Sequence, residues 1–440
     1  LEALNLMTNF SASLRQLFGG EIIWSDHLPW YYLSKYILIS IPLIVLTGVV
    51  LFFFMFKKLK GNLNYLWMFL ILFVFVFPVA YIINKESNVY GGWRHVLFIY
   101  PPMVIASGLG FEALTRSIKN KYVKIGAGLF VLFLAYHPVK HIIKNHPLEY
   151  IYYNQMVGGV DGAYGNFEMD YYYHSVRPAT EWLLNYLEDR SDMDEIIIAT
   201  NFAHTVKYYT RNNDNIKVVY IRYYDRGNSD WDYAIVANSY INPYQLQKDI
   251  WPPKNTIHTI KVDNSPVCAI LERKTKNNYR AYQALQNKDY SRAISLYEES
   301  LKVQPDNESA LMNLAIAYME TRQFNKSLQT ITKCLEIYPD YDKALNVLGI
   351  TYMNMNQLDH ALGVFNKITQ VNSKFVSAYY NIGVAYMRLN NSELAINYLK
   401  QAINVNKNYK PSYYALAEVL NRTGRQNEAN QVLEIVNRMN

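Results

Sequence analysis

Four strongly apolar segments dominate the first third of the chain, at residues 36–56, 63–83, 96–114 and 122–139. The first two contain no charged residue, and at about 1.5 Å per residue each is long enough to cross a hydrocarbon core about 30 Å thick. The third contains Pro101 and Pro102, and the fourth is a short apolar run that could equally be a buried or interfacial helix. The sequence predicts four transmembrane helices followed by a long polar region.

The loops between these segments predict how the helices are oriented. Basic residues gather in the loop after the first segment and in the loop around the start of the fourth, namely Lys57, Lys58, Lys60, Arg116, Lys119, Lys121 and Lys124. Such loops are expected on the cytoplasmic side of a membrane. Four crossings then place both termini, including the loop at residues 1–35, outside the cytoplasm. We expect a multi-pass protein of a bacterial inner membrane whose C-terminal domains are periplasmic.

The composition agrees with a membrane part joined to polar domains. Hydrophobic residues make up 51% of the chain, yet the mean hydropathy is only −0.11. The net charge of +7 is spread along the chain without a long basic run, which disfavours nucleic-acid binding. The cysteines Cys268 and Cys334 fall in separate predicted domains, so their number excludes a zinc site and their separation disfavours a disulfide.

The first residue is Leu1, and the segment that follows lacks the charged start, short apolar core and cleavage site of a signal peptide. We therefore expect this chain to be part of a longer protein that has earlier membrane spans.

From about residue 274 onward the chain repeats with a period of 34 residues. Small or branched residues recur at this interval, at Ala293, Ser327, Ala361, Ala395 and Ala429, and again at Leu314, Leu348, Ile382 and Leu416. A period of 34 is that of a helix pair in which small residues let the two helices approach closely. The pattern resembles the tetratricopeptide repeat (TPR) family. Five units, beginning near Lys274, Glu308, Asp342, Val376 and Lys410, are expected to stack into an α-solenoid over residues 274–440.

This resemblance implies a concave groove that binds a protein or peptide ligand. Its predicted lining comes from the first helices of successive units, with Asn313, Asn346, Tyr380 and Asn381 as candidates. The asparagines are equally compatible with solvated polar positions. The paired lysine and asparagine pattern that clamps chaperone-tail carboxylates is not found in the sequence, which disfavours that class of ligand.

Residues 140–273, between the membrane part and the repeats, predict a small α/β domain. Short β-branched and apolar runs predict strands at 195–200, 217–221, 233–237, 258–262 and 267–272, and longer amphipathic runs predict helices at 180–187 and 203–209. The fold class is therefore mainly α: a transmembrane helix bundle, then a small α/β domain, then an α-solenoid. The glycines at 158–165 do not have the order of a phosphate-binding loop.

Other chemical signals in the sequence are weak. His137 and His141 have the spacing of a helical zinc pair but lack the accompanying glutamate, and we predict no metal site. Glu168, Asp170 and His174 form a small cluster that suits either a cation or, more commonly, a hydrogen-bonded loop.

Two loops near the membrane carry a second resemblance. Residues 24–33 (WSDHLPWYYL) lead into the first apolar segment, and residues 90–96 (YGGWRHV) lead into the third, which continues with the proline pair. Both segments are similar to polytopic GT-C glycosyltransferases, in the branch of the protein mannosyltransferases and lipid A aminoarabinose transferases. The segments 146–150, 153–154, 158–159 and 167–171 also resemble the soluble tail of bacterial members.

The resemblance implies transfer of a hexosyl or pentosyl group from a polyprenyl-phosphate donor to an extracytoplasmic acceptor. A guanidinium at the membrane surface can pair with a lipid phosphate through two charge-assisted hydrogen bonds, which suits Arg94, and His95 could hydrogen-bond the same phosphate. Trp30, Tyr31, Tyr90 and Trp93 would pack on isoprene or sugar faces. The competing interpretation is that these aromatic and basic residues only anchor the protein at the membrane interface.

The chain also departs from this family's pattern. The resemblance places the general base, an acidic residue, in the first outer loop, and no position of this sequence matches it. Asp26 lies in a later loop, so we predict no catalytic residue here and expect this chain to be inactive alone. The resemblance leaves the cofactor unknown, with a divalent cation as one option for the longer protein.

Two other functions fit parts of the sequence. A membrane-anchored TPR scaffold for envelope assembly would need no chemistry, and the repeats alone favour it. A polysaccharide ligase or polymerase would use the same class of donor but calls for a large outer loop between spans. The sequence names neither the sugar, the acceptor nor the ligand of the groove.

Overall fold

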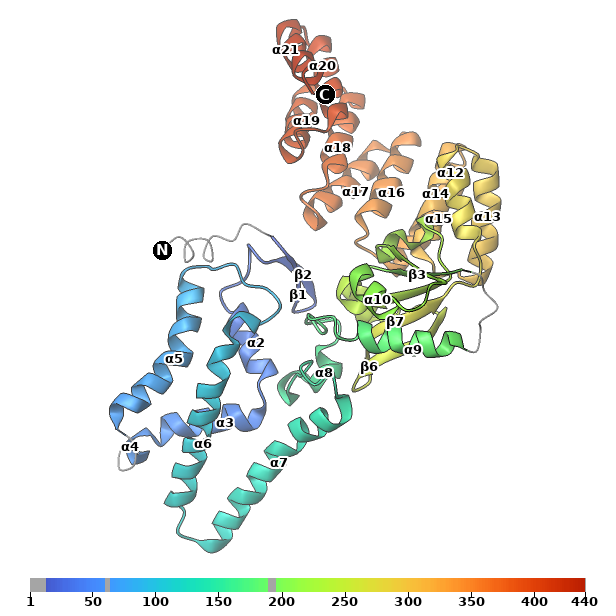
Figure 1. Cartoon of the computed structure of the whole chain (residues 1–440). Helices are drawn as coiled ribbons and strands as arrows, with labels where there is room; N and C mark the ends of the chain where they lie inside the picture. Colours follow the sequence, from blue (N-terminus) through green and yellow to red (C-terminus); the bar gives the residue numbers. More distant parts are fainter. Residues whose placement is uncertain (1–12, 60–63, 189–194, 440) are drawn as a thin grey trace. The chain divides into compact units, whose positions relative to one another are not determined.

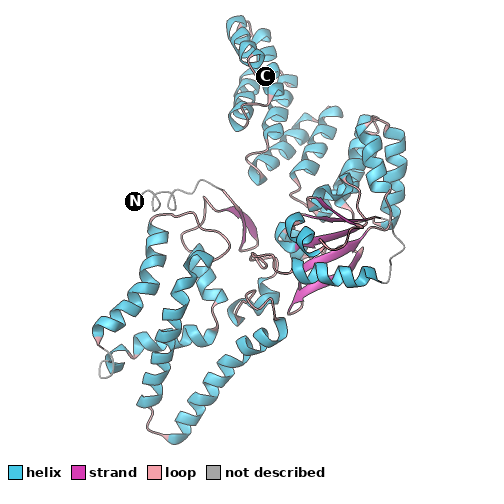
Figure 2. Cartoon of the chain, in the orientation of Figure 1, coloured by secondary structure: helices cyan, strands magenta, loops and turns pink. Residues whose placement is uncertain are grey.

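The computed structural model describes residues 13–59, 64–188 and 195–439 (Figure 1). Residues 1–12 of the predicted first loop, Lys60 and the start of the second apolar segment lie outside the described residues. The chain divides into two compact units: residues 1–218, 234–252 and 256–271 form the first, and residues 219–233, 253–255 and 272–440 form the second. Figure 2 shows that helices make up most of the chain, with strands in a two-stranded hairpin and in one five-stranded sheet.

The apolar helices belong to the first unit: α2 (Tyr32–Ser40), α3 (Leu43–Phe54), α4 (Phe56–Leu59), α5 (Tyr65–Asn84), η1 (Arg94–Ile99), α6 (Tyr100–Ser117) and α7 (Lys121–Asn145). Three helices are long and apolar enough to cross a membrane: α5, α7, and η1 together with α6. The pair α2 and α3 passes the same test as one broken span, bent by 111°. By length and composition the described residues therefore contain three candidate spans, or four if the bent pair counts as one.

The first apolar segment thus differs from the single straight helix that its composition predicts. The break lies at Ile41, whose backbone is extended with φ −90° and ψ 137°. Proline disfavours the helical conformation of the residue before it, and Pro42 follows directly. Pro42 is the N-cap of α3, so the chain leaves one helix and enters the next at this point.

Helices α3 and α6 cross with their backbones in close approach. A Cβ atom at Gly110 would lie 2.2 Å from the Gly48 carbonyl oxygen, and a Cβ at Gly48 would lie 1.9 Å from Ser107 Oγ. Ser107 Oγ donates a hydrogen bond to the Ile44 carbonyl, 3.3 Å away. Small residues at such crossings maximise packing between helices that share an apolar solvent.

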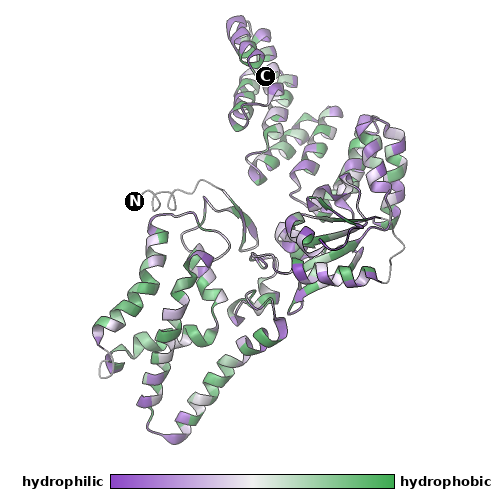
Figure 3. Cartoon of the chain, in the orientation of Figure 1, coloured by the Kyte–Doolittle hydropathy of each residue, from purple (hydrophilic) through white to green (hydrophobic). Residues whose placement is uncertain are grey.

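Two of the long helices present wide apolar faces (Figure 3). On α5, Phe69, Phe73 and Phe77 are exposed and stack on one another, with ring centroids 6.0 and 4.7 Å apart. On α7, Leu132 and Phe133 are exposed in the same way. An apolar surface of this extent requires a covering partner or an apolar solvent.

The loops of this unit gather at two ends of the helices. At one end Lys58 Nζ donates to Ser117 Oγ at 3.3 Å, which brings the two lysine-rich loops together. At the other end lies a hairpin of β1 (Arg15–Phe18) and β2 (Glu21–Trp24), paired antiparallel. The Gly20 N–H donates to the Asn166 carbonyl at 3.0 Å, and Phe18 bridges to Phe167.

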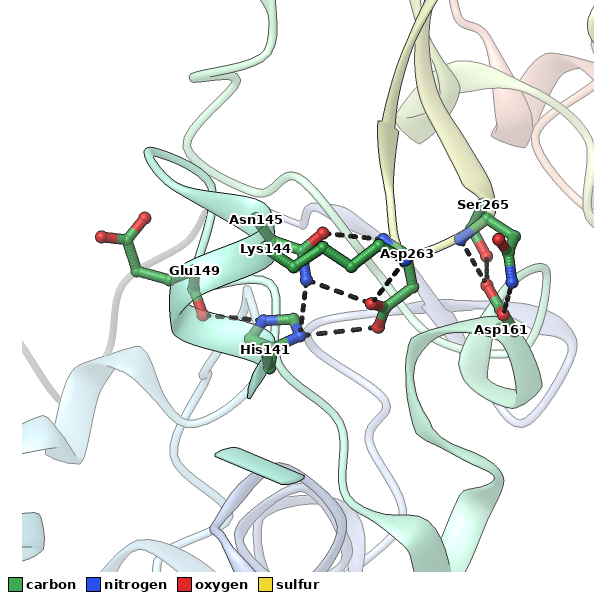
Figure 4. A network of polar contacts seen from close by, with 8 residues as sticks. His141, Lys144, Asn145, Glu149, Asp161, Asp263 and Ser265 are labelled. Atoms are coloured by element: carbon green, nitrogen blue, oxygen red, sulfur yellow. Dashed lines mark hydrogen bonds and ion pairs between the residues drawn. The ribbon is translucent and has the colours of Figure 1, made fainter. Parts of the chain in front are cut away.

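The C-terminal end of α7 is tied to the turn between β6 and β7 (Figure 4). Asn145 Nδ2 donates to Asp263 Oδ1 at 3.1 Å, and the Asp263 N–H donates back to Asn145 Oδ1 at 2.9 Å. Lys144 and His141 also contact the Asp263 carboxylate. Beside them, Asp161 accepts hydrogen bonds from Asn264 and Ser265.

A five-stranded sheet follows, in the order β4-β3-β5-β7-β6. Its strands are β3 (Ile196–Thr200), β4 (Ile216–Tyr220), β5 (Tyr233–Ala237), β6 (Thr256–Val262) and β7 (Ser265–Glu272), of which the last two pair antiparallel. All five lie at the ranges that the sequence predicts, within a residue or two. The helices and short turns of this region are η2 (Gln155–Val157), α8 (Gly159–Ala163), α9 (Val176–Glu188), α10 (Ala203–Tyr209), η3 (Tyr223–Asn228), η4 (Asn238–Tyr240) and α11 (Pro243–Gln247).

The second unit contains five helix pairs, as the 34-residue period predicts. They are α12 (Asn277–Gln286) with α13 (Tyr290–Val303), α14 (Glu308–Glu320) with α15 (Phe324–Ile337), α16 (Asp342–Asn354) with α17 (Leu358–Val371), α18 (Val376–Arg388) with α19 (Ser392–Val405), and α20 (Lys410–Arg422) with α21 (Gln426–Asn437). A residue with positive φ closes the first helix of each pair, at Lys288, Arg322, Asn356, Asn390 and Gly424. The absence of a side chain at Gly349 leaves room for the Phe365 ring, because a Cβ atom there would lie 2.4 Å from it. The repeat is thus a repeat of structure as well as of sequence.

The segment η3 packs onto the first helices of the repeats. Arg226 and Glu308 form a two-pronged ion pair with N–O distances of 2.6 and 3.0 Å, and the side chains are only 5% and 2% exposed. The Tyr224 ring lies 5.0 Å from that of Tyr338 and 5.6 Å from that of Tyr341. This segment is therefore part of the folded second unit.

Candidate functional site

A glycine turn positions the first candidate residue, Arg94. Gly91 and Gly92 have φ values of +65° and +69°, which favour glycine. The Gly91 N–H donates to Gln16 Oε1 at 2.7 Å, and the Gly92 N–H donates to Tyr32 Oη at 3.2 Å. A Cβ at Gly91 would lie 3.0 Å from the Arg94 side chain. The turn therefore both holds the loop against the hairpin and leaves room for the arginine.

Arg94 lines a polar cavity of about 270 Å³. Its guanidinium lies over the Tyr90 ring, 4.3 Å from the centroid. A second arginine, Arg15, lines the same cavity and donates to the carbonyls of Ser239 and Ile241 at 3.0 and 3.3 Å. Two guanidinium groups in one small cavity favour an anionic ligand.

An apolar cavity of about 340 Å³ adjoins the polar one. Its lining includes Trp93, Leu97, Tyr100, Pro138 and Ile142, contributed by the loop before η1 and by the long helices η1, α6 and α7. Four residues line both cavities, namely Gly91, Glu168, Met169 and Tyr171. The two cavities therefore adjoin each other: apolar side chains dominate the lining of one, and two arginines line the other.

The acidic residues near the cavities have different roles. Asp170 is buried and accepts hydrogen bonds from Tyr150 Oη, Ser175 Oγ and the backbone N–H groups of His174 and Ser175. This is the hydrogen-bonded loop that the sequence allows as one interpretation of the cluster. Glu168 instead lines both cavities.

The environment of Glu168 favours its neutral form. Burial raises the pKa of its carboxyl to about 7, although the Leu17 N–H and the charges of Arg15 and Arg94 act in the opposite direction. A carboxyl with such a pKa can gain or lose a proton near neutral pH.

The structure brings some of the sequence-predicted residues together and separates others. Arg94 and Tyr90 line the polar cavity, and Trp93 lines the apolar one. His95 is exposed and packs edge-on against Tyr90, with centroids 4.6 Å apart. Trp30 is 75% exposed and lies in a different hollow, and its neighbour Tyr31 packs against Trp30 and Phe18. Binding roles for these residues remain predictions.

Sequence reasoning missed several residues of the polar cavity, among them Arg15, Gln16 and Tyr171. Arg15 and Gln16 lie on a strand that no motif marks, and only the folding of the hairpin against the glycine turn brings them to Arg94. Glu168 and Tyr171 lie in the segment 167–171 that carries part of the family resemblance, which was the available signal.

The described residues contain no group of three or more histidine, cysteine, aspartate or glutamate side chains arranged to hold a metal ion. His141 is instead held in hydrogen bonds, to the Glu149 carbonyl at 3.2 Å and to Asn145 Nδ2 at 3.0 Å.

The predicted groove residues of the repeats take part in contacts within the solenoid. Asn381 Nδ2 donates to Asn346 Oδ1 at 2.8 Å, which joins the first helices of two successive units. Asn313 is buried, and the Tyr380 ring packs edge-on against Tyr409 at 5.7 Å. A role of these four residues in ligand binding remains a prediction.

The tetratricopeptide repeat family matches this chain at residues 284–333 and 376–409. Among solved structures, a crystal structure of MamA is 20% identical and is matched over 36% of this chain and 91% of its own, with a TM-score of 0.32. A thermophilic TPR protein of Thermus thermophilus is 24% identical over 36% of this chain and 88% of its own, with a TM-score of 0.34. No curated protein matches the chain. The C-terminal region is thus a TPR-type solenoid, a fold that serves protein interaction.

Proposed function

We propose that this chain forms the donor-binding part of an integral membrane glycosyltransferase that moves a sugar from a polyprenyl phosphate to an extracytoplasmic acceptor. The observation that carries the proposal is the pair of adjoining cavities around residues 91 and 168–171. A polyprenyl phosphate is an amphiphile with an anionic head and an isoprenoid tail. The arginine-lined cavity suits the head, and the cavity between the long apolar helices suits the tail.

In this proposal α5, α7, the η1–α6 segment and the broken pair α2–α3 cross the bacterial inner membrane. The exposed apolar faces of α5 and α7 would then contact lipid. The lysine-rich loops joined by Lys58 and Ser117 would lie in the cytoplasm, and the end that carries Arg94 would lie outside it.

Arg94 has the central role in this site. Its guanidinium would hold the phosphate through charge-assisted hydrogen bonds and stabilise the charge that develops on the leaving group during transfer. Arg15 would add a second positive charge from the hairpin. The TPR solenoid would recruit an acceptor protein or an envelope-assembly partner.

The replacement Arg94→Ala tests this function. In lipid nanodiscs, the affinity for a fluorescent polyprenyl monophosphate should fall at least about tenfold, because a charge-assisted pair is lost from a partly buried site. Arg116→Ala is the matched control, since Arg116 lies in the last turn of α6 and pairs with Glu112 at the surface. The Arg116→Ala variant should bind the fluorescent lipid with the same affinity as the unmodified protein.

The main alternative is a membrane-anchored TPR scaffold without catalysis, which the solenoid also fits. A scaffold has no need of a lipid-phosphate site, so Arg94→Ala would leave lipid binding unchanged. Equal binding by Arg94→Ala and the unmodified protein would therefore support the scaffold and contradict the glycosyltransferase.

A further inference from the structure

Glu168 is one of two carboxyl groups, with Asp170, in a cavity that two arginines also line. It lines the polar cavity together with Arg15 and Arg94, and it also lines the adjoining apolar cavity. Its backbone is fixed on both sides, because Tyr153 Oη donates to the Glu168 carbonyl and the Glu168 N–H donates to Tyr36 Oη at 3.4 Å. These contacts hold the Glu168 backbone at the boundary between the two cavities.

An ionised Glu168 would oppose an anion bound in this cavity. Like charges at short range in a partly buried site disfavour one another, and protonation of one of them removes the conflict. The carboxyl is already balanced between its two forms near neutral pH, since burial raises its pKa to about 7. A bound anion would raise this pKa further.

The other groups that face Glu168 are not expected to take up a proton when an anion binds. They are Tyr32 and Tyr36 from α2, Tyr153, and Asp170, Tyr171 and Tyr173 from the loop that carries Glu168. Burial raises the pKa of Tyr171 to about 12 and those of Tyr153 and Tyr173 further, so these tyrosines stay neutral. The Asp170 carboxylate is occupied by four hydrogen-bond donors.

We propose that the cavity takes up a proton at Glu168 when it binds the phosphate group of a polyprenyl phosphate, so that the anion is held with Glu168 neutral. This inference rests on the proposed function, because it names how the same site selects the charge state of its ligand. The sign follows from the linkage of binding to protonation: affinity is highest where Glu168 is already neutral, below pH 7, and it falls as the pH rises above 7.

The test uses a probe whose own charge is constant. The methyl ester of a polyprenyl phosphate is a phosphodiester that carries one negative charge throughout pH 6–8. In nanodiscs of zwitterionic lipid, the unmodified protein should bind it about fivefold more weakly at pH 8 than at pH 6, because the bound anion raises the pKa of Glu168. Calorimetry in two buffers of different ionisation enthalpy should show proton uptake at pH 7.5.

Three variants show which residue causes the pH dependence of binding. Glu168→Gln, which is isosteric and always neutral, should bind equally at pH 6 and pH 8, and at pH 8 more tightly than the unmodified protein. Glu181→Gln, at an exposed ion pair of α9, should keep the pH dependence. His95→Gln should also keep it, although His95 packs against Tyr90 beside the cavity.

Binding that is independent of pH in the unmodified protein, or a pH dependence that survives in Glu168→Gln, would overturn the inference while leaving the proposed function intact. A dependence that disappears in His95→Gln would assign the proton to that residue instead and would also overturn it. Absence of binding at every pH would contradict the proposed function itself. If Glu168→Gln does not fold, calorimetry on the unmodified protein and on His95→Gln still tests the inference: absence of proton uptake in the first, or its loss in the second, would overturn it.

Discussion

At the scale of single residues, the crossing of α3 and α6 depends on the absence of a side chain at Gly110. A methyl group there would meet the Gly48 carbonyl and the Phe52 backbone, neither of which can move without separating the helices. We expect Gly110→Ala to lower the free energy of unfolding by about 1–3 kcal/mol, as overpacking commonly does. Thermal unfolding of the protein in detergent would measure the loss.

Gly108 provides the matched control in the same helix. A Cβ at this position would meet no described atom within 4 Å, and alanine is the better helix former. Gly108→Ala should therefore leave stability unchanged or raise it slightly. Equal effects of the two replacements would contradict the close helix crossing.

Residue by residue, the candidate site could be predicted only in part. The loop sequence drew attention to Arg94, Tyr90 and Trp93, and these residues do line the two cavities. Arg15 could not be found, because its strand carries no chemical motif and its position depends on a hairpin packing against a distant loop. Trp30 and Tyr31 resemble the others in sequence but line neither of the two cavities, because they lie in the turn before α2.

At the scale of elements, the buried pair Arg226–Glu308 fastens η3 to the repeats. Burial opposes the charge of Arg226, but the facing carboxylate raises the pKa of its guanidinium above the usual range. Removal of one partner leaves the other charge buried and unpaired, at a cost of about 3–5 kcal/mol. We expect Glu308→Leu to speed the hydrogen exchange of residues 223–228 about 100-fold or more in the full-length protein.

The double variant Arg226→Met with Glu308→Leu separates charge from packing. Apolar residues of similar volume often replace a buried pair without loss, so exchange should return close to its original rate. Glu418→Ala, which removes an exposed i,i+4 pair with Arg422, should have little effect. Unchanged exchange in Glu308→Leu would show that the pair does not hold η3.

Among the elements, those with a strong local period were predictable and those that depend on distant contacts were not. The 34-residue spacing gives the helix pairs of the solenoid, and β-branched runs give the five strands. The break at Ile41 follows from Pro42, but the segment around it is uniformly apolar, and its composition therefore predicts one uninterrupted span. The packing of η3 on the repeats joins residues far apart in sequence, and no local pattern indicates it.

At the scale of the first unit, the contacts at its two ends indicate that the bent pair α2–α3 runs from one end of the unit to the other. The β1–β2 hairpin precedes α2 and is bound to Asn166 and Gly91, at the end that carries the candidate site. Lys58 follows α3 and lies beside Ser117 at the opposite end. The pair α2–α3 therefore leads from one end to the other, as a single broken span would.

The proposed function requires that the two adjoining cavities bind a lipid phosphate. The most direct measurement is photo-crosslinking of the protein in nanodiscs with a polyprenyl phosphate that carries a photoreactive group on its first isoprene unit, with the labelled peptides mapped over the whole chain. We expect labels in residues 90–100 and 168–172, competed by unlabelled polyprenyl phosphate but not by polyprenol. Labels confined to the outer faces of α5 and α7, or equal competition by polyprenol, would contradict it.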